Sequence, residues 1–394
     1  MLEYDVVVVG GGPAGSTAAR YAAMKGADVL MIEKRPEIGV PVRCGEGLNL
    51  GFLEEVKIPY DDSWVARKVK GARIFSPSGK FITLDASMAG EEVGCNIYRD
   101  KFDKYLAKLA IRSGVDVMLK TSAIGVIKEE GFVRGVKAKR LGEPLEIRAK
   151  VVIGADGFES QVGRWAGIDT TVNPRDIVSC LQYHLVGIDC NADYNDFYIG
   201  SCAPGGYAWV FPKGEDRANV GLGVQLTRLK GSGEVKIYLD KFVKNHPELS
   251  KGKVIEIVAG AVSTSQPLDR VVDNGIMLVG DAARVIDPLT GGGVAHACIT
   301  GMYAGMVAAE AVEAGDYSSK FLQRYEDMWR KRLEEKLYRN WMAKETASKL
   351  SDETFDKIID ALSGYEMKKV TTRALLEAIK EKYPEVMKDL EGLL

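Results

Sequence analysis

Apolar and polar residues change their spacing several times along this chain, and each change predicts a different kind of element. Residues 4–34 pass from an unbroken apolar run through a glycine turn and an alanine-rich stretch to a second apolar run that ends in an acid. Strand, turn, helix and strand in this order form a parallel βαβ unit. The chain is therefore expected to begin with an α/β fold of the Rossmann type.

The spacing then alternates between two patterns. Residues 68–84 and about 176–264 have the alternation and turn signals of antiparallel strands. Residues 98–127 instead predict a helix and a strand, and residues 149–167 predict an apolar strand that runs into a glycine turn. Residues 274–312 repeat strand, glycine turn and small-residue helix. A nucleotide-binding fold is thus interrupted by a second sheet and then resumed.

From Phe321 onward the pattern is that of charged amphipathic helices. The apolar positions at helical spacing are Phe321, Tyr325, Met328, Leu333, Leu337 and Trp341. We predict an α/β chain, α+β overall, with three domains. They are a discontinuous nucleotide-binding domain over 1–70, 95–175 and 265–320, an antiparallel-sheet substrate domain over 71–94 and 176–264, and a C-terminal helical domain over 321–394.

Composition and charge exclude several functional classes. The 53 basic and 55 acidic residues leave a formal net charge of −2 and are spread along the chain, so no nucleic-acid partner is expected. The six cysteines and three histidines lack metal-ligand spacing, and no metal site is expected. A strand predicted from residue 4 leaves no room for a signal peptide, and no run of about 20 apolar residues occurs. We expect a cytoplasmic protein, and peripheral contact with the inner face of the cell membrane stays open.

Three glycines follow the first strand in Gly-x-Gly-x-x-Gly register, namely Gly10, Gly12 and Gly15. The first permits a tight turn, the second lets a pyrophosphate approach the backbone, and the third lets the helix pack on the strand. The helix N-terminus faces the anion. Glu33 ends the second strand, where its carboxylate is placed to accept hydrogen bonds from ribose hydroxyls. These features predict a dinucleotide site without separating FAD from NAD.

Two later motifs favour FAD. The sequences GADG at 154–157 and GDAA at 280–283 each end an apolar strand. Together with Arg99 they resemble the flavoprotein hydroxylase and oxidoreductase superfamily. The resemblance implies an FAD-binding Rossmann domain of the glutathione-reductase type.

The same resemblance implies roles close to the flavin. Asp281 would hold the ribityl chain, and a helix that starts near Gly292 and Gly293 would stabilise reduced flavin with its positive end. No second Gly-x-Gly-x-x-Gly unit is present for a nicotinamide cofactor. The expected electron donor is therefore a protein such as ferredoxin, or a transiently docked reduced nicotinamide or deazaflavin.

The segment VPVRCGEGLNLG at 40–51 falls where this superfamily lays a loop across the flavin. Cys44 lies between Arg43 and Gly45. Either Cys44 is a small residue that fits a tight turn, or its thiol lies near the flavin and donates a proton or orients the substrate. In the second case Arg43 or a glycine-rich anion site nearby would raise its thiolate character. The sequence leaves both interpretations open.

The segment YAWVFPKGEDRANVGLG at 207–223 carries the most specific pattern. It consists of Tyr207, Trp209, Phe211 and Pro212, then eight residues, then Gly221 and Gly223. With the CGEG loop at 44–47 and the FAD motifs, it resembles the geranylgeranyl reductase family over nearly the whole chain. Among its members the chain is most similar to the archaeal enzymes that act on digeranylgeranylglycerophospholipids, rather than to the plant and bacterial enzymes that act on chlorophyll side chains.

This resemblance implies an activity and a set of flavin contacts. The implied activity is FAD-dependent saturation of the isoprenoid double bonds of geranylgeranylated glycerophospholipids, in archaeal membrane ether-lipid biosynthesis, by hydride transfer from reduced flavin plus a proton. The flavin-contacting positions that it implies are Ala14, Glu33, Cys44, Gly45, Gly47, Arg99, Ala123, Asp281, Gly293 and Val294.

The residues themselves permit a physical account of substrate binding. Tyr207, Trp209 and Phe211 share one face of a strand and predict an aromatic wall that suits a long hydrocarbon, although such residues also form ordinary sheet cores. Gly221 and Gly223 would leave room for a chain or an isoalloxazine edge. An isolated double bond has no carbonyl to accept charge, so hydride transfer needs a matched proton in a dry site. Cys44 or Tyr207 is the expected proton source, and the aromatic residues would add cation–π stabilisation.

Other interpretations remain at this point. The motifs are shared with FAD-dependent monooxygenases of aromatic or polycyclic substrates, and a non-catalytic flavin redox sensor would bind FAD without turnover. Basic residues of the C-terminal helical domain suit either a lipid headgroup and an anionic membrane surface, or a helix packed on its own protein. These residues are Arg330, Lys331, Arg332, Lys336 and Arg339.

Overall fold

The first apolar run forms the middle of an eight-stranded sheet in the computed structural model, which describes residues 2–85, 94–363 and 372–390. β1 (Leu2–Val9) lies parallel to β2 (Val29–Ile32) and to β11 (Glu143–Gly154). The other strands are β8 (Asp116–Met118), β9 (Thr121–Glu129), β10 (Phe132–Arg140), β17 (Val272–Asp273) and β18 (Ile276–Leu278). The parallel strands read as continuous apolar runs because both of their faces are buried.

Two helices pack unusually close to each other beside this sheet. α1 (Pro13–Met24) follows the glycine turn, and α8 (Val294–Ala314) follows the second glycine-rich segment. A Cβ atom at Gly301 of α8 would lie 2.3 Å from the carbonyl oxygen of Ala14, and one at Gly305 would lie 2.3 Å from that of Ala18. Glycines four residues apart on one helix face therefore bring α8 against α1. This contact places the start of α8 next to the start of α1.

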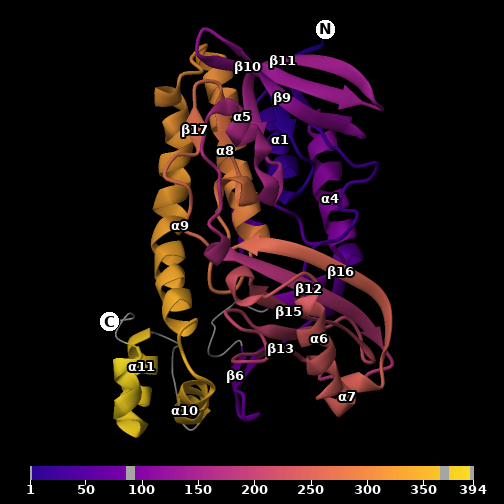
Figure 1. Ribbon diagram of the computed structural model, residues 1–394. Helices are drawn as coiled ribbons and strands as arrows, with labels where there is room; N and C mark the ends of the chain where they lie inside the picture. Colours follow the sequence, from indigo (N-terminus) through magenta and orange to yellow (C-terminus); the bar gives the residue numbers. More distant parts are fainter. Residues whose placement is uncertain (1, 86–93, 364–371, 391–394) are drawn as a thin grey trace.

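A seven-stranded sheet carries the aromatic segment (Figure 1). Its strands, in spatial order, are β16 (Lys253–Ser263), β12 (Ile177–Val186), β15 (Arg217–Gln225), β14 (Ala208–Pro212), β13 (Tyr194–Tyr198), β5 (Gly71–Phe75) and β6 (Phe81–Asp85). All neighbours are antiparallel except β13 and β5. Gln182, Gly221 and Trp209 lie opposite one another on β12, β15 and β14. They therefore share one face of the sheet.

Two helices of the substrate region were not predicted. α6 (Glu234–Lys244) and α7 (Pro247–Ser250) cover the face of the seven-stranded sheet opposite to Trp209, with Leu239, Phe242 and Leu249 buried. The interpretation of 176–264 as strand with little helix overlooked the helical spacing of these apolar residues. The remaining elements are β3 (Gly47–Asn49), β4 (Val65–Lys68) and β7 (Gly94–Ile97), which form a small third sheet, and the helices α2 (Phe52–Glu55), α4 (Arg99–Arg112) and α5 (Gln161–Ala166).

The C-terminal helices connect the two large sheets. α9 (Ser319–Ala347) runs along the eight-stranded sheet toward the seven-stranded one, where α10 (Asp352–Ser363) and α11 (Thr372–Lys382) follow (Figure 1). The residues of α9 that are buried to 2% exposure or less are Leu322, Tyr325, Trp329, Leu333 and Leu337. The fully buried position in this part of the helix is therefore Trp329, and not Met328 as the spacing predicted. α10 and α11 form a core with β6 through Ile359, Ile379 and Ile82.

The limits of the three predicted domains remain a proposal. The assignment of 71–94 and 176–264 to one domain is supported by β5 and β6, which join the strands of 177–263 in one sheet. Residues 86–93 of the predicted substrate domain, and 364–371 and 391–394 of the predicted helical domain, lie outside the described residues. Over the part of the chain that is described, no helix is both long and apolar enough to traverse a bilayer. No group of three or more His, Cys, Asp or Glu side chains there is arranged to hold a metal ion.

Candidate flavin and substrate site

The three fingerprint glycines have different reasons to be glycine. Gly10 has a φ of +113°, and a Cβ atom there would lie 2.3 Å from the carbonyl oxygen of Ala155. A Cβ atom at Gly15 would lie 1.9 Å from the carbonyl oxygen of Gly10. Both positions are closed by the fold itself. Gly12 differs, because nothing lies within 4 Å of its Cβ position.

Gly12 is also the N-terminal cap of α1, and no side chain caps that end of the helix. Its open space and the free N–H groups of the first turn form an anion-binding cradle. Beside the cradle, the Glu33 carboxylate accepts N–H bonds from Gly11 and Arg35, both at 2.9 Å. These bonds fix the carboxylate at the end of β2 while leaving lone pairs for ribose hydroxyls.

A cavity of about 1440 Å³ begins at this cradle and extends to the C-terminal helices. The predicted site residues that line it are Gly10, Gly12, Glu33, Cys44, Gly45, Arg99, Ala123, Asp281, Tyr207, Trp209, Phe211 and Gly223. The predicted residues that do not line it are Ala14, Gly15, Gly47, Gly221, Gly292, Gly293 and Val294. Twelve of the predicted cofactor and substrate residues thus open onto one continuous space.

The middle of the cavity is lined by carboxylates with few partners. Burial raises the pKa of Asp281, while the nearby guanidinium groups of Arg99 and Arg284 act in the opposite direction. Gly293, at the start of α8, would place a Cβ atom 3.3 Å from the Asp281 carboxylate. Asp156, in the GADG motif, has one oxygen bonded to the Val162 N–H and the other buried without a partner among the described residues. The GADG motif was part of the predicted FAD site, but Asp156 was not among the predicted site residues.

These features fit FAD. The cradle at Gly12 suits a pyrophosphate, Glu33 suits the ribose, and the unpartnered oxygen of Asp156 lacks a donor that a polar ligand would supply. The N-terminus of α8 at Gly293 lies next to the Asp281 carboxylate, and its positive dipole would stabilise a reduced flavin held there. A bound FAD would therefore be held by Gly12, Glu33, Asp156 and Asp281.

The aromatic residues form a wall on one face of the seven-stranded sheet. The ring centroids of Tyr207 and Trp209 are 5.8 Å apart, and those of Trp209 and Phe211 are 6.1 Å apart. Phe197 of β13 contacts both Tyr207 and Phe211. All four line the cavity, so they are more than sheet core.

The two glycines of β15 lie against protein side chains. A Cβ atom at Gly221 would lie 2.4 Å from the Trp209 ring, and one at Gly223 would lie 2.7 Å from Val178. Gly221 therefore makes room for a protein side chain, not for a ligand. The physical reason is register, since Gly221 lies directly opposite Trp209 and the indole lies across it.

Beyond the wall, the cavity extends between the seven-stranded sheet and the C-terminal helices, where a cluster of apolar side chains lines it. Its lining there includes Ile74, Ile82 and Ile199 from the sheet and Phe355, Ile359 and Ile379 from the helices. The sequence analysis did not assign these residues to the site. They come from three distant segments, and no local spacing relates them.

The comparisons with known proteins agree with this geometry. A model of the geranylgeranyl reductase catalytic domain matches residues 176–262, and a model of FAD dependent oxidoreductases matches residues 5–185. The chain is 54% identical to digeranylgeranylglycerophospholipid reductases of Thermoplasma volcanium and Thermoplasma acidophilum, over the full length of each pair. This chain belongs to the geranylgeranyl reductase family. It is an FAD-dependent oxidoreductase, as its motifs predicted.

Solved structures confirm the predicted fold class. A crystal structure of a geranylgeranyl bacteriochlorophyll reductase-like protein from Thermoplasma acidophilum superposes with a TM-score of 0.94, at 54% identity and with complete coverage of both chains. A myxobacterial chondrochloren halogenase superposes with a TM-score of 0.72 at 21% identity, covering 100% of this chain and 98% of the halogenase. The halogenase shares the fold with this geranylgeranyl reductase, and at that identity the likeness concerns the fold alone.

Proposed function

We propose that this geranylgeranyl reductase saturates the isoprenoid double bonds of geranylgeranylated glycerophospholipids. The observation that carries the proposal is the single cavity that joins the FAD cradle to an apolar space beyond the aromatic wall. A long hydrocarbon would lie against Trp209 and Phe211 and extend toward Ile359, since these surfaces exclude water. The names of the Thermoplasma relatives support the same lipid class.

The residues of this chain would divide the reaction between binding and proton supply. Reduced FAD, when bound, supplies the hydride. Trp209 and Phe211 orient the chain and keep the reacting double bond dry, which favours hydride and proton addition over reaction with water. Their ring faces would also stabilise positive charge at the more substituted carbon.

For the proton, the geometry favours Cys44 over Tyr207. The Tyr207 hydroxyl already donates to the carbonyl oxygen of Thr290, and burial raises its pKa. The Cys44 thiol lines the cavity and accepts the N–H of Glu46 at 3.2 Å, which leaves its own S–H free to donate. Burial alone would lower the pKa of Arg99, but Asp103 and Cys44 raise it well above its usual value, so a cation lies beside the thiol.

Replacing Tyr207 by phenylalanine is therefore expected to reduce turnover by less than about tenfold, because only a hydrogen bond of about 0.5–1.5 kcal/mol is lost. The measurement is the rate at which lipid reoxidises the reduced enzyme in a stopped-flow instrument. Thr290 accepts through its backbone, so no other side chain changes. A loss of about 100-fold or more would make Tyr207 the proton donor instead.

The function itself is tested without oxygen. The purified enzyme is reduced chemically, a geranylgeranylated ether phospholipid is added, and flavin absorbance is followed together with the mass of the lipid. The expected result is reoxidation with a gain of two hydrogens per double bond. Oxygen uptake that depends on NAD(P)H and an aromatic substrate, without lipid reduction, would instead support a monooxygenase.

We further propose that a protein or small-molecule donor, such as ferredoxin or a reduced nicotinamide or deazaflavin, reduces the FAD, and that the enzyme contacts the membrane peripherally. Of the basic residues on α9, Arg330 pairs with Glu326 and Glu334, and Arg332 pairs with Glu55. Those two stabilise the protein itself. Lys331, Lys336 and Arg339 are exposed, so they are the candidates for contact with anionic lipid.

The membrane proposal predicts a salt-dependent interaction. The enzyme is expected to co-sediment with phosphatidylglycerol vesicles at low salt and less at high salt, because exposed charges are screened. The triple variant K331E/K336E/R339E is expected to lose most of this binding while keeping its FAD. Equal binding of the variant and the parent would remove α9 as the contact surface.

A further inference from the structure

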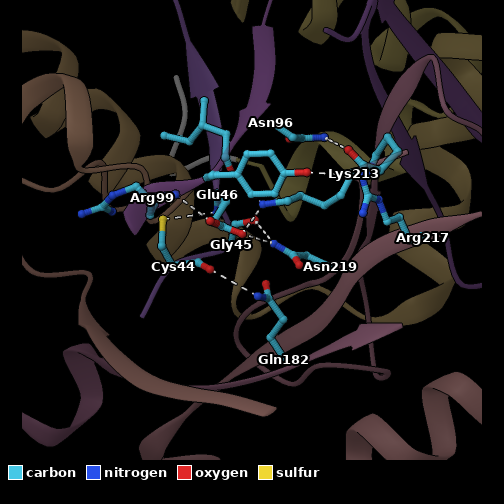
Figure 2. A network of polar contacts seen from close by, with 12 residues as sticks. Cys44, Gly45, Glu46, Asn96, Arg99, Gln182, Lys213, Arg217 and Asn219 are labelled. Atoms are coloured by element: carbon cyan, nitrogen blue, oxygen red, sulfur yellow. Dashed lines mark hydrogen bonds and ion pairs between the residues drawn. The ribbon is translucent and has the colours of Figure 1, made fainter. Parts of the chain in front are cut away.

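A layer of polar side chains lies directly behind the turn that carries Cys44 (Figure 2). Its centre is an ion pair between the Glu46 carboxylate and the Lys213 ammonium, 2.5 Å apart, whose side chains are only 8% and 2% exposed. Glu46 has a φ of +73°, a left-handed conformation that a glutamate rarely adopts. A strained residue and a buried charge pair therefore occur at the same point.

Every partner of this ion pair comes from a different part of the fold. The Glu46 carboxylate accepts hydrogen bonds from the Asn219 amide at 2.7 Å and from the backbone N–H of Arg99 at 2.8 Å. Lys213 also donates to the carbonyl oxygen of Ile97 at 2.6 Å. Burial lowers the pKa of Lys213, and the Glu46 carboxylate acts against this. The pair thus ties the turn to the start of α4, the end of β14 and the middle of β15.

The same layer also holds the backbone of Cys44 and Gly45. Asn219 donates to the Gly45 carbonyl oxygen at 3.1 Å, and Gln182 donates to the Cys44 carbonyl oxygen at 3.3 Å. Gln182 in turn accepts the Trp209 indole N–H at 2.9 Å. The position of the turn is therefore set relative to the aromatic wall by direct hydrogen bonds.

Stability alone does not account for such an arrangement. A buried ion pair is often no more stabilising than apolar side chains of the same volume, because both charges lose their hydration. Backbone strain of this kind is retained where the surrounding structure requires it. Both observations point to a positional requirement at the turn.

We propose that Glu46 and Lys213 are positioning residues that clamp the Cys44–Gly45 turn in the cavity, so that the thiol faces the wall that holds the substrate. Neither residue lines the cavity, so both act through Cys44 and Gly45. The consequence for catalysis rests on the proposed function, whereas the consequence for the position of the thiol does not.

The test uses the FAD-loaded full-length enzyme with three variants and one control. Lys213→Met leaves the buried Glu46 carboxylate without its counter-charge, and E46Q/K213M removes both charges. Asn219→Leu removes only the amide and leaves the ion pair. The control is Arg217→Gln, because Arg217 is an exposed cation on β15 whose side chain bonds only Tyr98 among the described residues.

Two readouts are measured on each protein. The first is the rate of iodoacetamide alkylation of Cys44, followed by peptide mass spectrometry, and the second is single-turnover reoxidation of reduced flavin across lipid concentrations. Lys213→Met is expected to change the alkylation rate and to slow the saturated reoxidation rate by about tenfold or more, because a displacement of about 1 Å has effects of this size or larger. The apparent affinity for lipid should stay unchanged. E46Q/K213M should recover most of the reoxidation rate that Lys213→Met loses.

Wild-type alkylation and reoxidation in folded Lys213→Met would overturn the proposal. If Lys213→Met does not fold, Asn219→Leu decides. Asn219→Leu is likewise expected to change the alkylation rate and to slow reoxidation, and parental values of both rates would contradict the clamp. Arg217→Gln should match the parent in both readouts. If Arg217→Gln changed both rates as much as Lys213→Met does, the cause would be a general charge effect, and this too would overturn the proposal. If lipid fails to reoxidise the parent enzyme, the proposed function fails, while the alkylation rates still judge the clamp.

Discussion

Replacing Cys44 by alanine is expected to leave FAD bound and to slow lipid-driven reoxidation by about 100-fold or more, the usual effect of removing a general acid. The Cys44 thiol lines the cavity and donates to no acceptor among the described residues, whereas the Tyr207 hydroxyl already donates to Thr290. Alanine fills the turn equally well, so the fold should not change. The measurement is anaerobic stopped-flow reoxidation together with the flavin absorbance spectrum.

Cys202→Ala is the matched control, because Cys202 is another partly buried thiol that lies outside the cavity lining. It should reduce lipid at the parent rate. If Cys44→Ala also keeps the parent rate, Cys44 only fits the turn, as the simpler interpretation of its sequence context has it. The proton would then come from another group or from water.

Replacing Gly12 by valine is expected to weaken FAD binding by about 100-fold or more, or about 2.7 kcal/mol, with little change in the melting temperature of the FAD-free protein. The reason is that nothing in the protein lies within 4 Å of a Cβ atom at this position, so the new side chain occupies the cradle alone. Its φ of −75° suits any residue. Titration of the FAD-free protein with FAD, followed by flavin fluorescence, measures the loss.

Gly231→Val serves as the comparison, because Gly231 likewise has nothing within 4 Å of its Cβ position and lies outside the cavity lining. It should bind FAD like the parent. Gly10→Val, by contrast, should fail to fold properly, since its Cβ atom would meet the Ala155 carbonyl oxygen. Unchanged FAD affinity in Gly12→Val would move the pyrophosphate away from this turn.

The apolar space beyond the wall lies within an architecture that this enzyme shares with other flavoproteins. The halogenase likeness extends over nearly the whole chain at 21% identity and therefore concerns the architecture. The relatives at 54% identity carry reductase names. Ile359 and Ile379, which close the apolar space, belong to helices at the C-terminal end of the chain. The shared fold does not by itself set the substrate class, which depends on the residues that line the site.

Much of the fold and the identity of the cofactor could be predicted from the sequence. The βαβ unit, Glu33 at the end of β2, and the glycine fingerprint depend on local spacing, and FAD, the family and the fold class are confirmed. The aromatic residues at 207, 209 and 211 were predicted to share a face because side chains alternate along a strand. α6 and α7 were missed because short amphipathic stretches between strands are easily assigned to the sheet.

By itself, the sequence determined the βαβ unit, the dinucleotide fingerprint and the composition of the wall, since each is encoded within about thirty neighbouring residues. Only the tertiary structure decided that Gly221 accommodates Trp209, and that Lys213 meets Glu46 across 167 positions of the chain. The physical reason is that strand register and the packing of separate segments set these contacts. Local spacing carries no information about which distant side chain will fill a given gap.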